Sequence, residues 1–122
     1  MITAAAITCL ALNLYHEGRD QTVDQQAWIG YVTVNRVADP RWPDTVCEVV
    51  YQPDQFSWYW DGKIDFPLEA EAYAIAVALS RDILTSDYRG TDALYYHTPQ
   101  VSPSWSTRVT PLGCYGTHVF YS

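Results

Sequence analysis

An apolar run near the start of the chain constrains the fold more than any other feature, because it ends in a single acidic residue. Apolar residues recur at helical spacing from Ile7 to Leu14, and Glu17 follows on the edge of the same helix face. Partial burial and the negative end of the helix dipole would both favour the neutral carboxyl and raise the pKa of Glu17, whereas Arg19 would act against this. The run predicts a first helix that Gly18 ends. It also offers Glu17 as a general acid, an ordinary solvated glutamate being the alternative.

Three further helices are predicted from start and stop signals. Thr22 to Gln25 has the spacing of a capping box, ahead of an apolar stretch from Ala27 to Ala38. We expect this stretch to be the buried centre of the domain, with a strand as the weaker alternative because of its β-branched residues. A short helix is expected from Asp44, as its N-cap, to Val50. Pro67 opens the clearest helix, whose expected buried stripe is Leu68, Ala72, Ile75, Ala76, Leu79 and Ile83.

The last third of the chain changes character after Gly90. Two short segments, Ala93 to His97 and His118 to Tyr121, stand apart among prolines and glycines and indicate extended pieces or strands. Residues 52–65 lack helical periodicity and resemble a loop or short hairpin that presents aromatic rings. No linker or repeat divides the chain, so residues 1–122 are expected to form one domain of the α+β class, mainly helical with a small β or loop lobe.

Composition excludes several classes of protein. Hydrophobic residues make up 48% and charged residues 17%, which excludes a disordered segment. A net charge of −7, with one lysine among seven basic residues, argues against nucleic-acid or anionic-membrane partners. Five tryptophans and ten tyrosines exceed what the core of such a chain requires and suit a half-wet groove for an uncharged polymer such as a glycan.

Cysteines and the N-terminal run say little about location. Cys9, Cys47 and Cys114 form an odd set without a CxxC pair, so they indicate neither a disulfide framework nor a zinc cluster, and at least one must be free. The stretch from Met1 to Leu14 lacks a positive leader region and is too short to span a bilayer. We therefore expect no signal peptide and no membrane insertion.

Six short motifs occur in the order seen in the SleB-type cell-wall hydrolases, and together they cover nearly the whole chain. They are Tyr15-His16-Glu17-Gly18-Arg19, Asn35-Arg36-Val37, Pro43 with Val46-Cys47, Gln55-Phe56-Ser57-Trp58, Tyr95-Tyr96-His97, and the ending Gly116-Thr117-His118-Val119-Phe120-Tyr121. The resemblance implies a small, two-lobed, lysozyme-like catalytic domain that cleaves peptidoglycan without a cofactor or metal. It further implies that Glu17 is the catalytic acid. The family more often has alanine where this chain has Gly18.

Cleavage of the β-1,4 bond between N-acetylmuramic acid (MurNAc) and N-acetylglucosamine (GlcNAc) needs a protonated donor near neutral pH. Hydrolytic glycosidases add a second carboxylate. Lytic transglycosylases use the 6-hydroxyl of the muramic acid instead and give a 1,6-anhydro product. No other acid stands in a motif as distinctive as that of Glu17, so we favour a transglycosylase over a muramidase; the other candidate acids are Asp20, Asp24, Asp61, Asp65 and Asp92.

Polar and aromatic side chains of the same motifs are the expected groove contacts, since hydroxyl, amide and imidazole groups bind sugar hydroxyls and rings stack on pyranose faces. If residues 93–97 form a strand, one of Tyr95 and Tyr96 must point inward. Asn35 and Arg36 are expected to tie the lobes together. The expected substrate-binding residues are Tyr31, Gln55, Phe56, Ser57, Trp58, Tyr95, Tyr96 and His97.

Two other functions are open to this sequence. His16, His97 and His118 could serve a zinc-dependent amidase, but no HxxxH or HExxH spacing supports it. A wall-binding module without catalysis is the other, and the Glu17 motif counts against it. We expect a monomer acting on peptidoglycan glycan strands, best explained as a phage lysin made in the host cytoplasm and released through a pore, with a bacterial housekeeping enzyme as the alternative.

Overall fold

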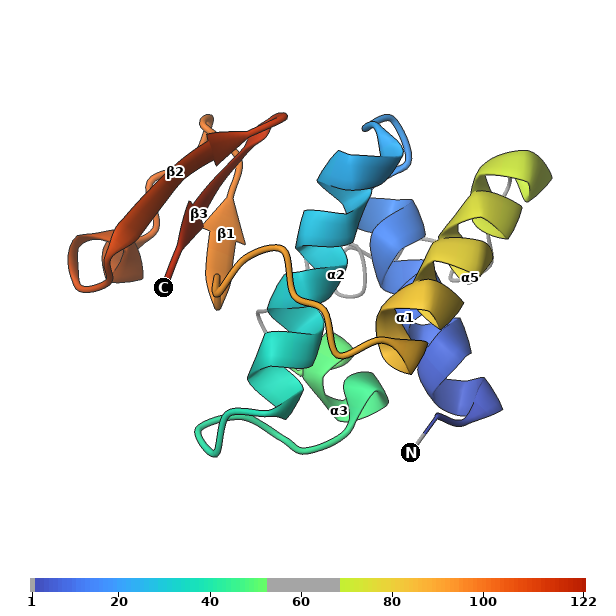
Figure 1. The fold of residues 1–122 in the computed structure, drawn as a ribbon. Coiled ribbons are helices and arrows are strands. Elements are labelled where there is room, and N and C mark those ends of the chain that lie inside the picture. Colours follow the sequence, from blue (N-terminus) through green and yellow to red (C-terminus); the bar gives the residue numbers. More distant parts are fainter. Residues whose placement is uncertain (1, 53–68) are drawn as a thin grey trace.

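The computed structural model describes residues 2–52 and 69–122, which form a helical part followed by a small antiparallel sheet (Figure 1). The α+β class, mainly helical with a small β lobe, is thereby confirmed. Among the described residues, no helix is long and apolar enough to cross a bilayer. The described elements are α1 (Ala4–Gly18), α2 (Val23–Val37), α3 (Val46–Val50), α5 (Ala70–Thr85), β1 (Tyr95–His97), a 3-10 turn η1 (Ser104–Thr107), β2 (Pro111–Tyr115) and β3 (His118–Tyr121).

Helix α1 is the centre of the helical part, where it contacts α5, α2 and α3. Thr3 caps its start, because the Thr3 Oγ1 accepts a hydrogen bond from the Ala6 amide at 3.0 Å. Leu10 and Leu14 are fully buried, as the helical spacing of the apolar run predicts. The predicted first helix is therefore confirmed, and its apolar face forms part of the main core.

Gly18 is the last residue of α1, but it does not end the helix through a left-handed backbone. The glycines with positive φ in the described part are Gly113 and Gly116. A Cβ atom at Gly18 would lie 2.6 Å from the Cδ1 of Ile29 in α2. Glycine is thus explained by the close approach of two helices, and Ile29 would have to shift to admit the alanine that the SleB-type family more often has there.

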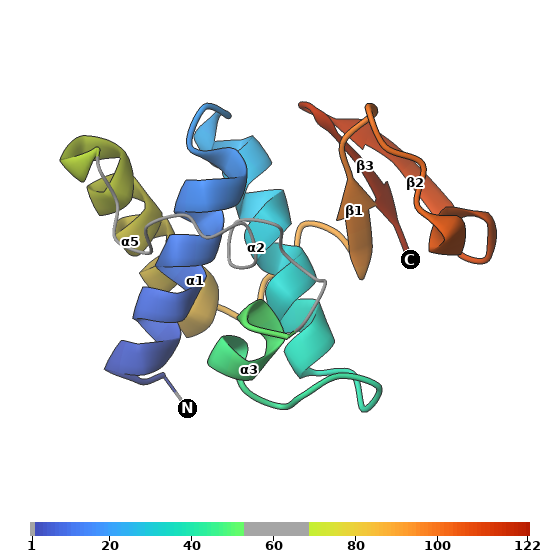
Figure 2. The same ribbon diagram turned by 180° about the vertical axis from the view of Figure 1, so that it is seen from behind.

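Helix α2 lies between the other helices and the sheet (Figures 1 and 2). The predicted capping box is present: Gln25 N donates to Thr22 Oγ1, and Thr22 N donates to Gln25 Oε1, both at 3.2 Å. The helix therefore spans Val23–Val37 and begins a turn earlier than its apolar stretch predicts. Ile29 belongs to the main core and Val32 to the core under the sheet, so α2 is buried on two sides as expected.

The short helix α3 begins one residue later than predicted. Thr45, and not Asp44, is its N-cap: Thr45 Oγ1 accepts from Glu48 N at 3.2 Å and donates to Glu48 Oε1 at 2.7 Å. A threonine hydroxyl, like an aspartate carboxylate, can accept a hydrogen bond from an unpaired amide of the first turn. The predicted Asp44 cap is therefore wrong, while the helix itself is confirmed.

A disulfide joins Cys9 of α1 to Cys47 of α3, whose Cα atoms lie 5.2 Å apart. The sequence does not predict it, because the two residues are 38 apart and no local motif pairs them. Cys114 is free and exposed, in agreement with the expectation of at least one unpaired cysteine. The bond ties α1, which carries Glu17 in its last turn, to its neighbour α3.

Helix α5 buries a stripe that differs from the predicted one. Ala76, Ser80 and Ile83 are buried, whereas Ile75 is 42% exposed. The prediction for Ile75 is wrong because residues 76, 80 and 83 form the face of α5 that packs on the core. Ile75 lies beside this face, toward solvent. The helix begins at Ala70; Ala72 and Leu79 are half-buried, and the predicted helix-start residues Pro67 and Leu68 lie outside the described residues.

The sheet has the order β1-β3-β2 with antiparallel pairing throughout. β1 and β3 confirm the two predicted extended segments. β2 was not predicted, since Pro111 and Gly113 usually interrupt strands. It forms at the edge of the sheet, where the register is irregular between these two residues and Gly113 takes a φ of 114°. An edge strand tolerates a proline and a glycine that would break the hydrogen-bond pattern of a central strand.

Candidate functional site

Glu17 lies half-buried in the last turn of α1 and meets the sheet through a hydrogen bond. The Tyr96 hydroxyl of β1 donates to Glu17 Oε1 at 2.9 Å. The helical run predicts the position of Glu17 on its helix, but the partner comes from 79 residues further along the chain. The structure thus brings together two of the residues that the sequence singles out.

Strand alternation places Tyr95 and Tyr96 on opposite faces of β1, as expected. The Tyr96 ring stacks on Phe120 at 5.8 Å and lies 5.0 Å from the His118 ring, on the face toward α2. Tyr95 packs on the other face, against Trp42 at 5.6 Å and Trp105 at 5.1 Å. Tyr96 is therefore the inward residue of the pair.

Burial raises the pKa of the Tyr96 phenol well above its ordinary value, and the charge of Glu17 and the hydrogen bond to it raise it further. Arg36 and the Asn13 amide act in the opposite direction. The phenol therefore keeps its proton at neutral pH. Its hydroxyl can therefore donate to the carboxylate of Glu17.

Asn35 and Arg36 tie the sheet to α2, and this prediction is confirmed. Asn35 Nδ2 donates to the carbonyls of Thr91 and Ala93, both at 2.9 Å. Arg36 Nε donates to the Leu94 carbonyl at 2.7 Å. Burial lowers the pKa of the Arg36 guanidinium, against which the neighbouring tyrosines act. These bonds hold the chain just before β1 against α2, and so fix the position of the strand that carries Tyr96.

Arg19, expected to influence Glu17, is engaged elsewhere. Its Nε donates to Glu69 Oε1 at 2.9 Å in an exposed ion pair, and its guanidinium lies 5.0 Å from the centre of the Tyr15 ring. Glu69 N in turn donates to the Tyr15 hydroxyl at 3.0 Å. These contacts join the end of α1 to the start of α5.

His97 uses both ring nitrogens within the fold. Its Nδ1 lies 2.7 Å from the Thr98 carbonyl, and its Nε2 lies 2.7 Å from the Tyr121 hydroxyl. A carbonyl only accepts, so Nδ1 carries a proton, and Nε2 forms the second hydrogen bond with the Tyr121 hydroxyl. His97 is therefore a structural residue on the Tyr95 face, and its contact with substrate stays a prediction.

His118 is a residue near the site that the list of groove contacts does not include. Burial lowers its pKa, the charge of Asp20 raises it, and His97 lowers it. Its ring packs on Tyr96, the direct partner of Glu17. The alternation of β3 could have found it, since His118 must share a face with the buried Phe120.

Tyr31, another of the expected groove residues, lies on α2 and packs against Tyr88. Its ring lies 6.0 Å from the Tyr88 ring, beside a shallow hollow of about 400 Å³ between α2 and the β2 side of the sheet. Burial raises the pKa of the Tyr31 phenol, as does nearby Tyr88. The hollow is lined by Asp24, Ala27, Trp28, Tyr31, Tyr88, Gly90 and Tyr115.

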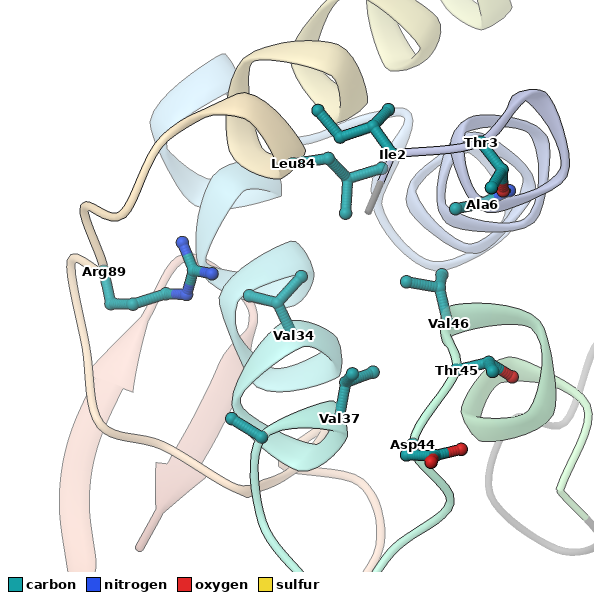
Figure 3. Close-up of a pocket in the computed structure, with 11 residues that line it drawn as sticks. Ile2, Thr3, Ala6, Val34, Val37, Asp44, Thr45, Val46, Leu84 and Arg89 are labelled. Carbon is teal, nitrogen blue, oxygen red and sulfur yellow. The ribbon is translucent and has the colours of Figure 1, made fainter.

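A second hollow, of about 470 Å³, lies where α1, α2 and α5 approach α3 (Figure 3). Its wall is mainly apolar, with Arg89 and Asp44 at its edges. None of the predicted site residues lines it. The expected groove beside Glu17 involves Gln55, Phe56, Ser57 and Trp58, which lie outside the described residues, so their contacts stay predictions.

No group of three histidine, cysteine, aspartate or glutamate side chains in residues 2–52 and 69–122 could hold a metal ion. His16 packs edge-on against the Tyr15 ring at 5.1 Å, and His97 and His118 have the contacts described above. The described geometry therefore gives the zinc amidase no support.

Comparisons with known proteins agree on one family. The Cell Wall Hydrolase family matches residues 20–121. The spore cortex-lytic enzyme of Bacillus subtilis (strain 168) is 29% identical over 116 residues, and that of Oceanobacillus iheyensis is 30% identical over 115. Each match covers 93% of this chain, which spans 36% and 40% of the two relatives' lengths.

Solved structures extend the similarity to the whole chain, including Glu17. The catalytic domain of the germination-specific lytic transglycosylase SleB from Bacillus anthracis matches with a TM-score of 0.80 and 25% identity, over 99% of this chain and 97% of that one. The catalytic domain of the Bacillus cereus SleB protein has a TM-score of 0.77 at 23% identity, over 100% and 93%. These matches confirm the SleB-type, lysozyme-like fold. With the family match over most of its length, they show that the chain belongs to the cell wall hydrolase family.

Proposed function

We propose that this domain cleaves peptidoglycan glycan strands at the β-1,4 bond between MurNAc and GlcNAc, as a lytic transglycosylase with Glu17 as its single acid and base. Membership of the cell wall hydrolase family supports the substrate class. The similarity to a catalytic domain described as a lytic transglycosylase supports the reaction type.

The observation that carries the proposal is the hydrogen bond from Tyr96 to Glu17. A half-buried carboxyl at the end of a helix, held by a donor from the other part of the molecule, has the fixed position that a general acid needs. The family pattern begins at residue 20, so this geometry supplies the argument for Glu17 itself.

The reaction balances without water or a cofactor. Protonated Glu17 gives its proton to the bridging oxygen while the bond from that oxygen to MurNAc C1 breaks, and the electron pair stays on the oxygen of the departing GlcNAc. The 6-hydroxyl of the same MurNAc then bonds to C1 and loses its proton to the Glu17 carboxylate. Glu17 ends protonated, and the product end is 1,6-anhydroMurNAc.

The candidates for a second carboxylate that the structure describes are exposed, which supports this route over hydrolysis. Asp20, Asp24 and Asp92 are exposed, and Asp24 lines the hollow beside Tyr31. Asp61 and Asp65 lie outside the described residues. A hydrolase would need a second carboxylate close to the bond that breaks.

Product analysis distinguishes the functions. Purified peptidoglycan is digested and the fragments are identified by mass spectrometry. We expect 1,6-anhydroMurNAc ends; reducing ends would show a muramidase or glucosaminidase, and released peptides an amidase. Sedimentation with the wall without any product would show a binding module.

The role of Glu17 is tested by Glu17→Gln, which keeps the size of the side chain and removes the proton donor. We expect a loss of two or more orders of magnitude in rate, on the scale of about 10²–10⁴ that acid-base catalysis provides. Glu71→Gln, at an exposed position in the first turn of α5, is the matched control. Near-normal activity of a folded Glu17→Gln protein would overturn the assignment.

A further inference from the structure

The hollow beside Tyr31 gathers four aromatic side chains around a space of about 400 Å³. The rings form two pairs. Trp28 and Tyr115 lie 4.7 Å apart, centre to centre, where α2 meets the sheet, and Tyr31 and Tyr88 lie 6.0 Å apart where α2 meets the segment that leads to β1. Asp24, in the first turn of α2, adds a carboxylate to the lining. The wall is therefore aromatic, with polar groups at its rim.

This hollow is separate from the site at Glu17. Its lining on α2 comes from residues 24, 27, 28 and 31, which share one helix face. Ile29 approaches Gly18 of α1 from another face of α2. Neither Glu17 nor its partner Tyr96 lines the hollow. Residues 86–94 cross α2 on the side turned toward the viewer in Figure 1 and close the hollow there.

The segment that carries Tyr88 is held in place beside α2. Arg89 Nη1 donates to the carbonyls of Ser86 and Tyr88, both at 2.9 Å. A Cβ atom at Gly90 would lie 2.8 Å from Cε2 of Tyr31, so the glycine lets the Tyr31 ring lie against the backbone. The Tyr88 side chain is nevertheless 66% exposed. A large ring held at the rim of a hollow and facing water is available to a ligand at a low entropy cost.

The charges around the hollow select the class of ligand. Among the described residues that line it, none is a lysine or arginine, so a phosphate or carboxylate would have no cationic partner there. Asp24 would attract an ammonium group, but Arg89 opposes this. Beyond the effects of burial and Tyr88, Arg89 lowers the pKa of the Tyr31 phenol more than Asp24 raises it. A neutral ligand is therefore favoured.

A pyranose ring has the matching chemistry. Its C–H faces can stack on aromatic rings, and its hydroxyls can bond to phenols and to a carboxylate at the rim. A hollow of this size lies within the range of pockets that hold small ligands. GlcNAc is the uncharged sugar of the peptidoglycan strand, so it fits the charge of the hollow as well as its rings.

We propose that this hollow is a second glycan-binding site, which holds a GlcNAc unit of the strand away from Glu17. The choice of a glycan rests on the proposed peptidoglycan substrate. Attachment of one polymer at two places raises the effective concentration of the strand at the other place. The hollow thus keeps the domain on the polymer and takes no part in bond cleavage.

The first test is an NMR titration of the whole domain with tetra-N-acetylchitotetraose, a neutral GlcNAc oligomer. We expect saturable shifts of the Trp28 indole N–H and of the Gly90 and Tyr115 amides, while amides next to Glu17 report on the catalytic groove separately. Nα-acetyllysine amide, which carries an ammonium group, should leave the hollow unchanged. A hollow that ignores the saccharide, or that responds to the lysine probe alone, would overturn the inference.

The second test removes the exposed ring. Tyr88→Ala should raise the Kd of the saccharide at the hollow about three- to tenfold, the scale of one aromatic contact. Tyr88→Phe keeps the ring and should retain most of the affinity. Ile75→Ala is the matched control, because Ile75 is a 42% exposed apolar residue of α5 outside the hollow. Equal affinity in all four proteins, wild type included, would contradict the proposal.

Kinetics on insoluble peptidoglycan distinguish a second site from the catalytic groove. Tyr88→Ala should raise KM by a similar factor and leave kcat unchanged, because the hollow holds the strand without touching the bond that breaks. A fall in kcat with unchanged KM would place Tyr88 in the catalytic groove and overturn the second site.

The saccharide titration needs no turnover, so the two proposals can fail separately. If the hollow binds the saccharide but peptidoglycan yields no product, the proposed function fails and the second site stands. Products formed by a protein whose hollow does not respond to the saccharide would give the reverse result.

Discussion

The helical part and the sheet hold the two ends of the Glu17–Tyr96 hydrogen bond by different means. The helical part has a large core around α1 and a disulfide to α3. The sheet has short strands and a small core of Val32, Ala93 and Phe120 against α2. The proposed acid therefore stands on a helix with extensive packing, whereas its donor Tyr96 stands on a short strand and packs where the two cores meet. We expect the site to be lost locally before the helices unfold.

The strongest way to break this comparison is Phe120→Ala. Phe120 is 1% exposed and fills the small core under the sheet, so its truncation should cost about 3–5 kcal/mol. Hydrogen exchange should accelerate in the strands while α1 amides keep their protection. Leu112→Ala, at a 45% exposed position of β2, is the control. Equal loss of protection in α1 would show that the two parts form one cooperative unit.

The disulfide tests the helical side. Replacing Cys9 and Cys47 together by alanine should lower the free energy of unfolding by about 2–4 kcal/mol, since the bond closes a loop between residues 38 apart. Urea denaturation followed by helical circular dichroism measures the change. Cys114→Ala should have little effect, because Cys114 is exposed and free. If strand exchange rose more than helix exchange, the bond would be supporting the sheet instead.

A smaller effect is expected from Asn35→Ala at the joint between the two parts. The variant leaves the carbonyls of Thr91 and Ala93 without their shared donor and should cost ~1–3 kcal/mol. The variant should accelerate hydrogen exchange in the strands more than in the helices, and it should lower kcat. Ser102→Ala, in an exposed segment, provides the baseline. Equal acceleration of hydrogen exchange in the helices and the strands would argue against a joint that acts locally on the sheet.

The smallest effect concerns pH. Burial lowers the pKa of His118, so the unfolded chain takes up a proton near pH ~6.5 while the folded chain still resists it. Stability should therefore fall as pH drops through this value, and level off below the folded pKa. His118→Asn should flatten the fall in Tm between pH 7.5 and 5, taken as approximate limits. Asp20→Asn should steepen it, because Asp20 raises the pKa of His118; identical slopes in all three proteins would contradict the assignment.

Local signals predict the helices well, and long-range contacts account for what they miss. The Thr22–Gln25 capping box lies within one turn, so the sequence alone reveals it. Cys9 and Cys47 pair only because α1 packs on α3, and no spacing rule encodes that. Strand β2 forms because it pairs with β3 at the edge of the sheet, where Pro111 and Gly113 are tolerated.

The candidate site shows the same limit. The position of Glu17 follows from helical periodicity, and alternation predicts that Tyr95 and Tyr96 differ. Which of the two faces Glu17 depends on how the sheet docks on α2, through contacts such as that of Trp28 with Phe120 at 5.1 Å. The sequence therefore offers Glu17 as the candidate acid, whereas the structure was needed to identify Tyr96 as its hydrogen-bond donor.

The central place of β3 in the sheet has a consequence for biosynthesis. β3 follows both of its neighbours in the sequence, so β1 and β2 leave the ribosome before the strand that joins them exists. Domains fold as they emerge, and the helices before residue 86 can pack while translation continues. Tyr96 gains its place only when residues 118–121 are released. The helix that carries Glu17 can therefore form early in translation, whereas the hydrogen bond from Tyr96 to Glu17 forms only after β3 has emerged.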